Sequence, residues 1–474
     1  MRKIISAAIL VNVLIALPAQ ESAMRCRLGF SYEFSNNKNW GKDRPVIMKV
    51  YPDSPAERAG VRQNDIIEQI NSMKVTDIAM DDVDSLLTAS EDSHIVLTVR
   101  NFSDSARVTP LTKECYSNRS LNESQLATAF SMYSVEDTHD RLFVCPFVTV
   151  TTEEATDFSQ FKTFDFSVVE GDKSISNIES VISETLKAVL TKKGLSVSAL
   201  NPDIMIHTYY AFNRNPSFRK SRATEEQAPV FRYDITRDKV VKFPFYSSST
   251  PESEAEYVLQ LGIRFIDRRF VPGRVLWECE TNELMSAPYS LEEYAAIHIP
   301  LMCMQFPYVK YNRNAQFILS KKAYNYTGIN YNIYRINEVI SVDSDSPAAK
   351  AGILPRDIIE RIEGKRMDYT VPEFTAAYRQ FITNTLKYRD KDTRFTDANG
   401  FVGRMFWDTF KYPRIAKDFE KDSNMTAFSY LYAFQPFVNP TRSTSCTFDI
   451  RRGGERIRIV VRPVFYSEKT IELN

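Results

Sequence analysis

Hydrophobic residues in the middle of the chain follow the periods of strands and helices. Residues 142–151 form an apolar, β-branched run that predicts a strand, and residues 164–166 begin a second one. Alternating apolar and polar positions predict three further strands, at residues 204–210, 259–265 and 275–279.

Two helices are predicted among these strands. Ser176 and Glu179 form a capping box, apolar residues then recur at helical spacing, and a Lys-Lys-Gly run marks the helix end. Ser290 and Glu293 form a second capping box, which opens a very apolar helix. The order strand-strand-helix-strand-strand-strand-helix predicts an α+β domain over residues 140–312, with helices on one face of a sheet.

An internal repeat lies on either side of this domain. Residues 53–71 and 345–363 are identical at eleven positions, at a constant offset of 292 residues, so the chain holds two copies of one module. In each copy Ser-Pro-Ala predicts a one-turn helix, because Ser is a good N-cap and Pro suits the first helical position. A short strand, Asp-Ile-Ile, follows, and upstream Gly29 and Gly328 each open a strand between apolar residues.

Both copies resemble PDZ domains, most closely those of bacterial periplasmic proteases. The residues that carry the resemblance are S-P-A-x-x-A-G followed by D-I-I, together with the L-G-F and T-G-I loops. The resemblance implies that each module binds a protein C-terminus or an extended segment as an added strand. The family usually has Gly just before the Asp, whereas Asn64 and Arg356 stand there in this chain. Because Arg adopts a positive φ poorly, a distorted turn is expected in the second copy.

The resemblance also places a peptide-binding site in each module. Backbone N–H groups of the Gly loop would capture a terminal carboxylate, and apolar residues of a following helix would line a side-chain pocket. That helix is expected at residues 80–87 in the first module and at residues 372–382 in the second. The predicted peptide-binding residues are Leu28, Gly29, Phe30, Val83, Leu86 and Leu87 in the first module, and Thr327, Gly328, Ile329, Phe374, Ala377 and Tyr378 in the second.

The second module carries an aromatic-rich insertion at residues 383–443, ahead of a closing hairpin at residues 447–462. The insertion is either buried against the rest of the protein, which we favour, or a partner surface. Its place beside the expected helix makes blocking of the second site a further hypothesis. The predicted domains are a first module at 24–115, a linker at 116–139, the middle domain at 140–312, a linker at 313–324 and a second module at 325–474.

The middle domain resembles a bacterial envelope family, domain of unknown function 4136. Residues 157–164, 192–195 and 201–204 carry the resemblance, together with Ile266-Asp267 and the Val-Leu-Trp-Glu run at 275–278. The resemblance implies an envelope location rather than an activity. The predicted fold class is α+β multidomain, with two PDZ-type, partly open β-barrels with helices flanking a central α+β sandwich.

The first residues predict export. Arg2 and Lys3 precede a short apolar run and small residues, as in a signal peptide at 1–19, cleaved after Ala19 or, alternatively, after Ala23. We therefore expect a periplasmic or secreted bacterial protein with no integral membrane span. Export permits disulfides. Among the six cysteines, Cys26 and Cys115 bracket the first module and are the favoured pair, and Cys303, in an apolar run, is expected to be a buried free thiol.

Charge and motif content narrow the functional classes. The 60 basic and 60 acidic residues balance, so the basic excess of a nucleic-acid binder is missing. The sequence has no G-x-S-x-G, H-E-x-x-H, Walker or dinucleotide-binding motif, and its four His are scattered. We expect no enzyme activity, metal or cofactor. The leading hypothesis is a non-catalytic adaptor for protein C-termini or extended segments. The alternatives are an envelope structural or assembly protein with closed or vestigial grooves, and an inactive or partner-completed protease-like accessory.

Overall fold

A computed structural model describes most of the chain. It covers residues 24–51, 54–88, 93–102, 105–117, 119–125, 141–167, 176–219, 230–237, 239–244, 252–270, 272–332, 334–367 and 445–474, with short pieces between 383 and 414. The predicted signal peptide, the helix expected at 372–382 with Phe374, Ala377 and Tyr378, and nearly all of the aromatic-rich insertion lie outside the described residues.

The first module is built from short strands and one long helix. Its elements are β1 (Met24–Arg27), β2 (Phe30–Phe34), β3 (Pro45–Val50), α1 (Pro55–Arg58), β4 (Ile66–Ile70), β5 (Met73–Lys74), α2 (Met80–Thr88), β6 (His94–Arg100), β7 (Arg107–Thr112) and β8 (Glu114–Ser117). Among the described residues, the main sheet has the order β2-β3-β4-β6-β7 and stays open, with β5 paired to β4. A separate ribbon pairs β1 with β8, and a disulfide joins Cys26 to Cys115, which confirms the predicted pair.

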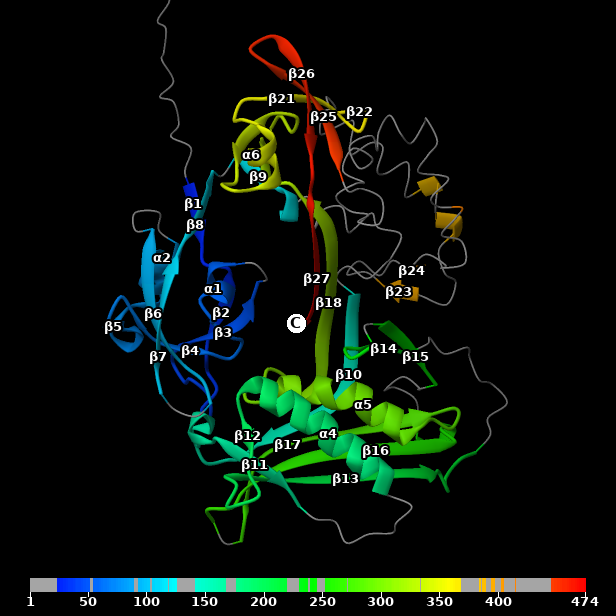
Figure 1. Cartoon of the computed structure of the whole chain (residues 1–474). Helices are drawn as coiled ribbons and strands as arrows, with labels where there is room; N and C mark the ends of the chain where they lie inside the picture. Colours follow the sequence, from blue (N-terminus) through cyan, green and yellow to red (C-terminus); the bar gives the residue numbers. More distant parts are fainter. Residues whose placement is uncertain are drawn as a thin grey trace, which may run out of the picture.

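The middle domain is the α+β unit that the hydrophobic pattern predicts. Its elements are β10 (Arg141–Thr151), β11 (Thr163–Phe166), α4 (Ser176–Lys193), β12 (Ser196–Val197), β13 (Ile204–Arg214), β14 (Val230–Asp234), β15 (Lys239–Phe243), β16 (Tyr257–Asp267), β17 (Arg274–Met285) and α5 (Leu291–Met302). The central sheet is mixed: β11 pairs in parallel with β12 and β13, and the remaining pairs are antiparallel. Helices α4 and α5 lie together on one face of this sheet (Figure 1).

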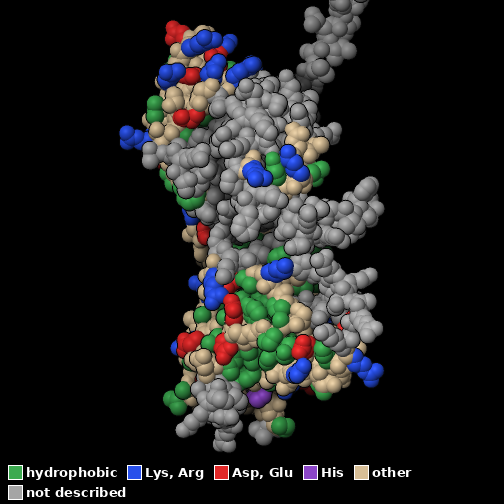
Figure 2. All heavy atoms as spheres, turned by 90° about the vertical axis from the view of Figure 1, so that its right-hand side faces the viewer, with side chains coloured by type: hydrophobic (Ala, Val, Ile, Leu, Met, Phe, Trp, Pro, Cys, Tyr) green, Lys and Arg blue, Asp and Glu red, His purple; other side chains and the backbone are tan. Residues whose placement is uncertain are grey.

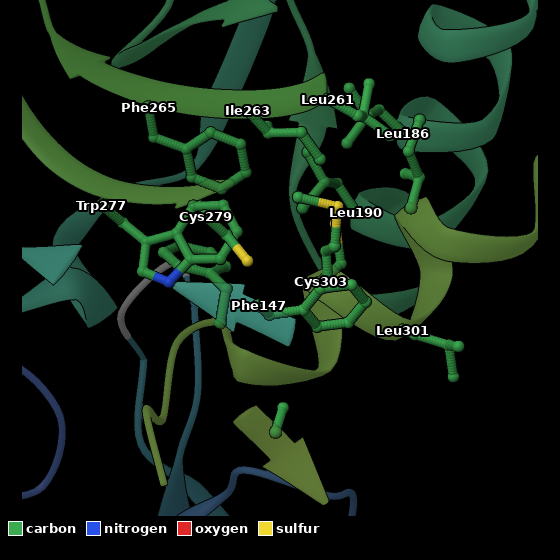
Figure 3. Packing of buried hydrophobic residues seen from close by; sticks show 14 of the residues in the cluster. Phe147, Leu186, Leu190, Leu261, Ile263, Phe265, Trp277, Cys279, Leu301 and Cys303 are labelled. Carbon is green, nitrogen blue, oxygen red and sulfur yellow. The ribbon is translucent and has the colours of Figure 1, made fainter. Parts of the chain in front are cut away.

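The core of the middle domain lies between this sheet and the two helices. Alternate residues of β16 and β17 point toward the helices, so Ile263, Phe265 and Cys279 are fully buried. Figure 3 shows them beside Leu190 of α4 and Cys303. Cys303 is a buried free thiol, as predicted. The side chain of Ser290 accepts a hydrogen bond from the Glu293 N–H, as the capping box requires.

Two strands outside the predicted middle domain extend its sheet. The residues predicted as a linker at 313–324 belong instead to β18 (Arg313–Tyr326), and the chain ends in β27 (Val464–Leu473). The sheet therefore reads β12-β11-β13-β16-β17-β10-β18-β27 within the described residues. In Figure 1, β18 and β27 run side by side from the middle domain up to the second module.

The described part of the second module repeats elements of the first. It contains β19 (Ile329–Asn332), β20 (Val339–Val342), α6 (Pro347–Ala351), β21 (Ile358–Ile362), β22 (Lys365–Arg366), β25 (Cys446–Arg452) and β26 (Glu455–Val461). The predicted closing hairpin is present as the β25–β26 pair. A short strand from the predicted 116–139 linker, β9 (Ser120–Asn122), joins β19 and β20 in a three-stranded sheet. Two small strands of the insertion, β23 (Arg394–Thr396) and β24 (Val402–Arg404), pair with each other.

The first module packs firmly on the middle domain. The Trp40 and Phe102 rings contact each other, and Phe102 stacks on Phe306 with 5.4 Å between ring centroids. Arg100 donates to Asp157 at 3.1 Å and to the Ser159 hydroxyl at 2.7 Å across the same boundary.

Figure 2, which views the molecule from the right of Figure 1, shows hydrophobic side chains gathered over the middle domain with charged side chains around them.

A buried ion pair attaches the β14–β15 hairpin to the central sheet. The Arg232 guanidinium of β14 lies 3.0 Å from the Glu283 carboxylate of β17, and both side chains are 4% exposed. Burial raises the pKa of Glu283, and the Arg232 charge opposes that shift. The pair is therefore needed mainly because each charge would be costly without the other.

Replacing one member of this pair should cost much more than replacing both. We expect Arg232→Met to lower the free energy of unfolding by about 3–5 kcal/mol, because it leaves a buried carboxylate uncompensated. Arg232→Met combined with Glu283→Leu should recover most of this loss. Urea unfolding of the single and double variants measures the difference, and equal losses in both would contradict the explanation.

Candidate functional site

The glycine loop is held by the same backbone hydrogen bonds in both modules. In the first module, the Gly29 carbonyl accepts from the Tyr51 N–H at 2.8 Å, and the Leu28 carbonyl accepts from the Ala56 N–H at 2.9 Å. In the second module, the Gly328 carbonyl accepts from Asp343 at 2.8 Å, and the Thr327 carbonyl accepts from Ala348 at 2.9 Å. Each loop is thus fastened to the one-turn helix that follows it in the repeat.

Glycine is required in this loop for two reasons. Gly29 and Gly328 both have φ of +85°, in the left-handed region that residues with side chains rarely adopt. A Cβ atom at Gly29 would lie 2.1 Å from the Cβ of Ser54, and one at Gly328 would lie 2.2 Å from the Cβ of Ser346. These serines cap the one-turn helices α1 and α6. A substitution at Gly29 would therefore disturb the fold of the module as well as its loop.

A buried aspartate fixes the next turn in both copies. Asp65 and Asp357, at most 1% exposed, accept from Arg107 and Arg452, respectively, at 2.7 Å. The same two arginines also donate to the carbonyls of the helix-ending glycines, at 2.9 Å in the first module and 2.7 Å in the second. The repeat thus extends to matched side-chain contacts that lie outside the identical segment of sequence.

The expected distortion of the second turn is wrong. Asn64 and Arg356 have φ of 69° and 73°, and both donate their N–H to the preceding strand, at 2.7 and 2.8 Å. The turn therefore keeps one geometry in both modules. Arg356 adopts the left-handed conformation at an energetic cost that the surrounding hydrogen bonds outweigh.

The first site consists of the Leu28–Phe30 loop and the outer edge of β2. In the described part of the chain, β2 pairs only with β3. The one described side chain that bonds to the backbone of this loop is Ser54, whose hydroxyl donates to the Gly29 carbonyl at 3.1 Å.

The predicted lining residues of the first site divide by burial. Val83 and Leu87 of α2 are buried in the module core, as is Leu28, whereas Phe30 and Leu86 are only half-buried. Strand β2 and helix α2 are also joined directly, because the Tyr32 hydroxyl donates to the Asp84 carboxylate at 3.1 Å. Burial, followed by this bond, raises the pKa of Tyr32 to about 12. Leu86 and Phe30 are thus the predicted apolar residues that a peptide beside β2 would meet.

The second site consists of the Thr327–Ile329 loop and the edge of β19 that faces away from β20. Here the loop is filled. The Glu123 carboxylate accepts from the Thr327 N–H at 2.7 Å, from the Gly328 N–H at 3.0 Å and from the Thr327 hydroxyl. Glu123 as a whole residue is 4% exposed. These N–H groups are predicted from the sequence to bind a carboxylate, but nothing in the sequence marks Glu123 as the group that they bind.

Burial dominates the ionisation of Glu123. It raises the pKa of this carboxyl to about 7, while the hydrogen bonds from Thr327 and Gly328 act in the opposite direction and the Asp343 charge adds to the rise. Near neutral pH the group is therefore shared between its acid and its carboxylate forms.

The position of His298 is explained by packing in the core of the middle domain. His298 is fully buried, its ring stacks on Tyr294, and burial lowers its pKa well below the ordinary value.

Among the described residues, no cluster of His, Cys, Asp and Glu could hold a metal ion. No described helix combines the length and apolar character needed to cross a membrane.

Comparisons with known proteins agree with the two resemblances in part. A family model described as "PDZ domain" matches residues 46–101, and one described as "Domain of unknown function (DUF4136)" matches residues 148–308. Neither of these two matches covers the second copy of the repeat. No curated protein matches the chain.

Among solved structures, a PDZ domain protein from Parabacteroides distasonis is 47% identical over 95% of this chain and 100% of its own, with a TM-score of 0.81. The PDZ domain of HtrA3 with a phage-derived ligand is 17% identical over 20% of this chain and 89% of its own, with a TM-score of 0.18. PelC from Paraburkholderia phytofirmans is 13% identical over 33% of this chain and 97% of its own, with a TM-score of 0.17.

The raised pKa of Glu123 predicts a pH-dependent stability. Its folded-state pKa of about 7 exceeds the ordinary value of 4.5, so the folded protein holds this proton more tightly. The resulting stabilisation is complete below the ordinary pKa and is lost as pH rises through the folded pKa. Between about pH 5 and about pH 8, wild-type protein should lose on the order of 3 kcal/mol relative to Glu123→Gln, which does not titrate. Urea unfolding at both pH values tests this, and parallel pH profiles would contradict it.

Proposed function

The chain belongs to the same family as the PDZ domain protein of Parabacteroides distasonis, and we propose that it is a non-catalytic adaptor. Its first module takes the C-terminus or an extended segment of another protein as a strand added to β2. The observation that carries the proposal is the unpaired edge of β2 in the described structure, which begins at a loop of the kind that presents several N–H groups together.

We infer further that the described elements between Thr327 and Val461 belong to a second module of the PDZ type, while β27 belongs to the central sheet. The support is the agreement of the two copies in the glycine loop, the capping serine, the left-handed turn and the buried Asp–Arg pair. Such agreement in hydrogen bonds is a stronger argument than the eleven identities alone, because it includes Arg107 and Arg452, which lie outside the repeat.

We also propose that the protein works in the bacterial envelope, periplasmic or secreted. The Cys26–Cys115 disulfide supports an oxidising compartment. The basic, apolar N-terminal segment supports export.

A second candidate function is a structural role in an envelope assembly. The contact of Glu123 with the second site favours it for that module, because a site filled from within the chain is closed to partners. The two functions are compatible if the first module binds peptides and the second organises the chain.

Peptide binding at the first site is tested with a library of peptides that end in a free carboxylate. We expect selective binding at about micromolar affinity, or about −8 kcal/mol, since one added strand buries little surface. Amidation of the peptide C-terminus should abolish it, because the loop would lose its carboxylate ligand. Fluorescence anisotropy of labelled peptides, to which the mature protein is added, measures the affinity and its loss on amidation.

A matched pair of variants assigns the binding to this module. Leu86→Ala removes a half-buried apolar side chain from α2 and should weaken binding about tenfold. Ser85→Ala changes the exposed neighbour and should leave binding unchanged. Gly29→Val is unsuitable, because its clash with Ser54 would disturb the whole module. If no peptide binds, or if amidated peptides bind equally well, the adaptor proposal fails.

The compartment proposal predicts a disulfide that forms in the cell and stabilises the protein. Reduction should lower the free energy of unfolding by about 2–4 kcal/mol, because the bond closes a long loop in the unfolded chain. A Cys26→Ser, Cys115→Ser variant should already be destabilised and should not respond to reductant. Mass spectrometry of alkylated protein from the native envelope fraction tests formation, and a free Cys26 thiol there would contradict the proposal.

A further inference from the structure

A strand from outside the second module lies on the edge of β19. Strand β9 runs antiparallel to β19, with Asn122 opposite Asn330 and Ser120 opposite Asn332. The other edge of β19 pairs with β20, so β19 lies between two strands, whereas its counterpart β2 lies at the end of its sheet among the strands that the structure describes. In Figure 1, β9 lies among the elements of the second module, in the upper part of the molecule. This added strand has the orientation that β-strand addition requires at the second site.

The direction of β9 brings an acidic residue to the glycine loop. The chain runs from Ser120 toward the loop, and Glu123 follows directly after the last paired residue. Its carboxylate accepts two backbone N–H bonds and one hydroxyl bond there, and almost no surface of the side chain is exposed. A carboxylate in a nest of backbone donors at the end of an added strand is what a partner's C-terminus would supply.

A local motif turns the backbone away at the point where a free C-terminus would stop. The Asn122 side chain accepts from the Gln125 N–H at 2.8 Å, and the Gln125 side chain accepts from the Asn122 N–H at 2.9 Å. This reciprocal pair is a capping box, and residues 123–125 begin a helical turn. The backbone therefore leaves the edge of β19, and only the Glu123 side chain continues into the loop.

We propose that residues 120–123 are an internal ligand of the second module, which closes that module to protein C-termini until Glu123 is withdrawn from the loop. The proposal rests on the inference that the described elements between Thr327 and Val461 belong to a PDZ-type module. The partner implied is a protein or peptide with a free C-terminal carboxylate, since the same donors would bind it. Because the internal ligand is part of the chain, it competes at an effective concentration of about millimolar. A micromolar peptide present at low concentration therefore does not displace it.

The test compares two full-length variants that differ in one segment. Glu123→Ala removes the carboxylate from the loop. Arg119→Ala changes an exposed residue of the same segment and serves as the control. The probes are peptides with a free C-terminal carboxylate and a photoreactive residue near that end, each with an amidated form. Cross-linked residues are identified by mass spectrometry, which separates binding at 327–332 from binding at 28–34.

We expect Glu123→Ala to bind at residues 327–332 at least about tenfold more tightly than wild type or Arg119→Ala, with loss of binding on amidation. Equal labelling of these residues in wild type and Glu123→Ala would show that Glu123 does not close the second site, and would overturn the proposal. A folded Glu123→Ala protein that no peptide labels there would overturn the internal-ligand assignment and leave β9 as a purely structural strand. Labelling at 28–34 reports on the first module separately, so the two proposals can fail independently.

A milder variant keeps the test valid if Glu123→Ala does not fold. Glu123→Gln keeps the size of the side chain and one acceptor oxygen, and it should give a smaller gain in labelling at 327–332. Acetate provides a second measurement. If the loop is a carboxylate site, acetate but not chloride should raise the melting temperature of Glu123→Ala and leave that of wild type unchanged. An equal response of both proteins to the two salts would contradict a carboxylate site.

Discussion

Backbone N–H groups that open a strand have to find acceptors, and in both modules this requirement is concentrated in one glycine loop. The positive φ of Gly29 and Gly328 sets the loop geometry, and the close approach of Ser54 and Ser346 prevents any larger residue from replacing them. The modules differ in how the requirement is met. The second loop has Glu123 as its acceptor, whereas no described side chain accepts from the first loop. This one contact separates a module that is open at its strand edge from one that is filled.

The contact depends on elements that hold both of its partners in place. On one side, β9 follows β8, which is paired with β1 and joined to it by the Cys26–Cys115 disulfide. Strand β1 in turn runs directly into the glycine loop of the first module. On the other side, β18 leads into Thr327 and is a strand of the central sheet between β10 and β27. A short segment held between two such supports loses little further freedom when it binds, so three paired residues and one carboxylate are sufficient.

The sequence could predict the features that depend on near neighbours. The Ser290 cap of α5 and the one-turn helices of the Ser-Pro-Ala segments appear where they were expected, because their hydrogen bonds span a few residues. Residues 313–324 are predicted as a linker, yet they pair with β10 and β27, which lie far from them in the sequence. Arg356 was expected to distort its turn because propensity alone ignores the bonds around it. The Glu123 contact joins residues 204 positions apart, and the sequence near Glu123 shows only a capping motif.

The balance of forces at the second site explains why a single group can control it. Strand β9 has three residues, all of them half-buried, so the apolar surface that it buries is small. The Glu123 carboxylate, in contrast, supplies three hydrogen-bond contacts in a place that water hardly reaches. Burial also makes its charge costly, which is why its pKa rises to about 7 although N–H donors surround it. The segment is thus held by its tether and by one buried carboxylate more than by packing. The first module has the opposite arrangement, because Trp40, Phe102 and Arg100 fix it to the middle domain while no described strand pairs with the outer edge of β2.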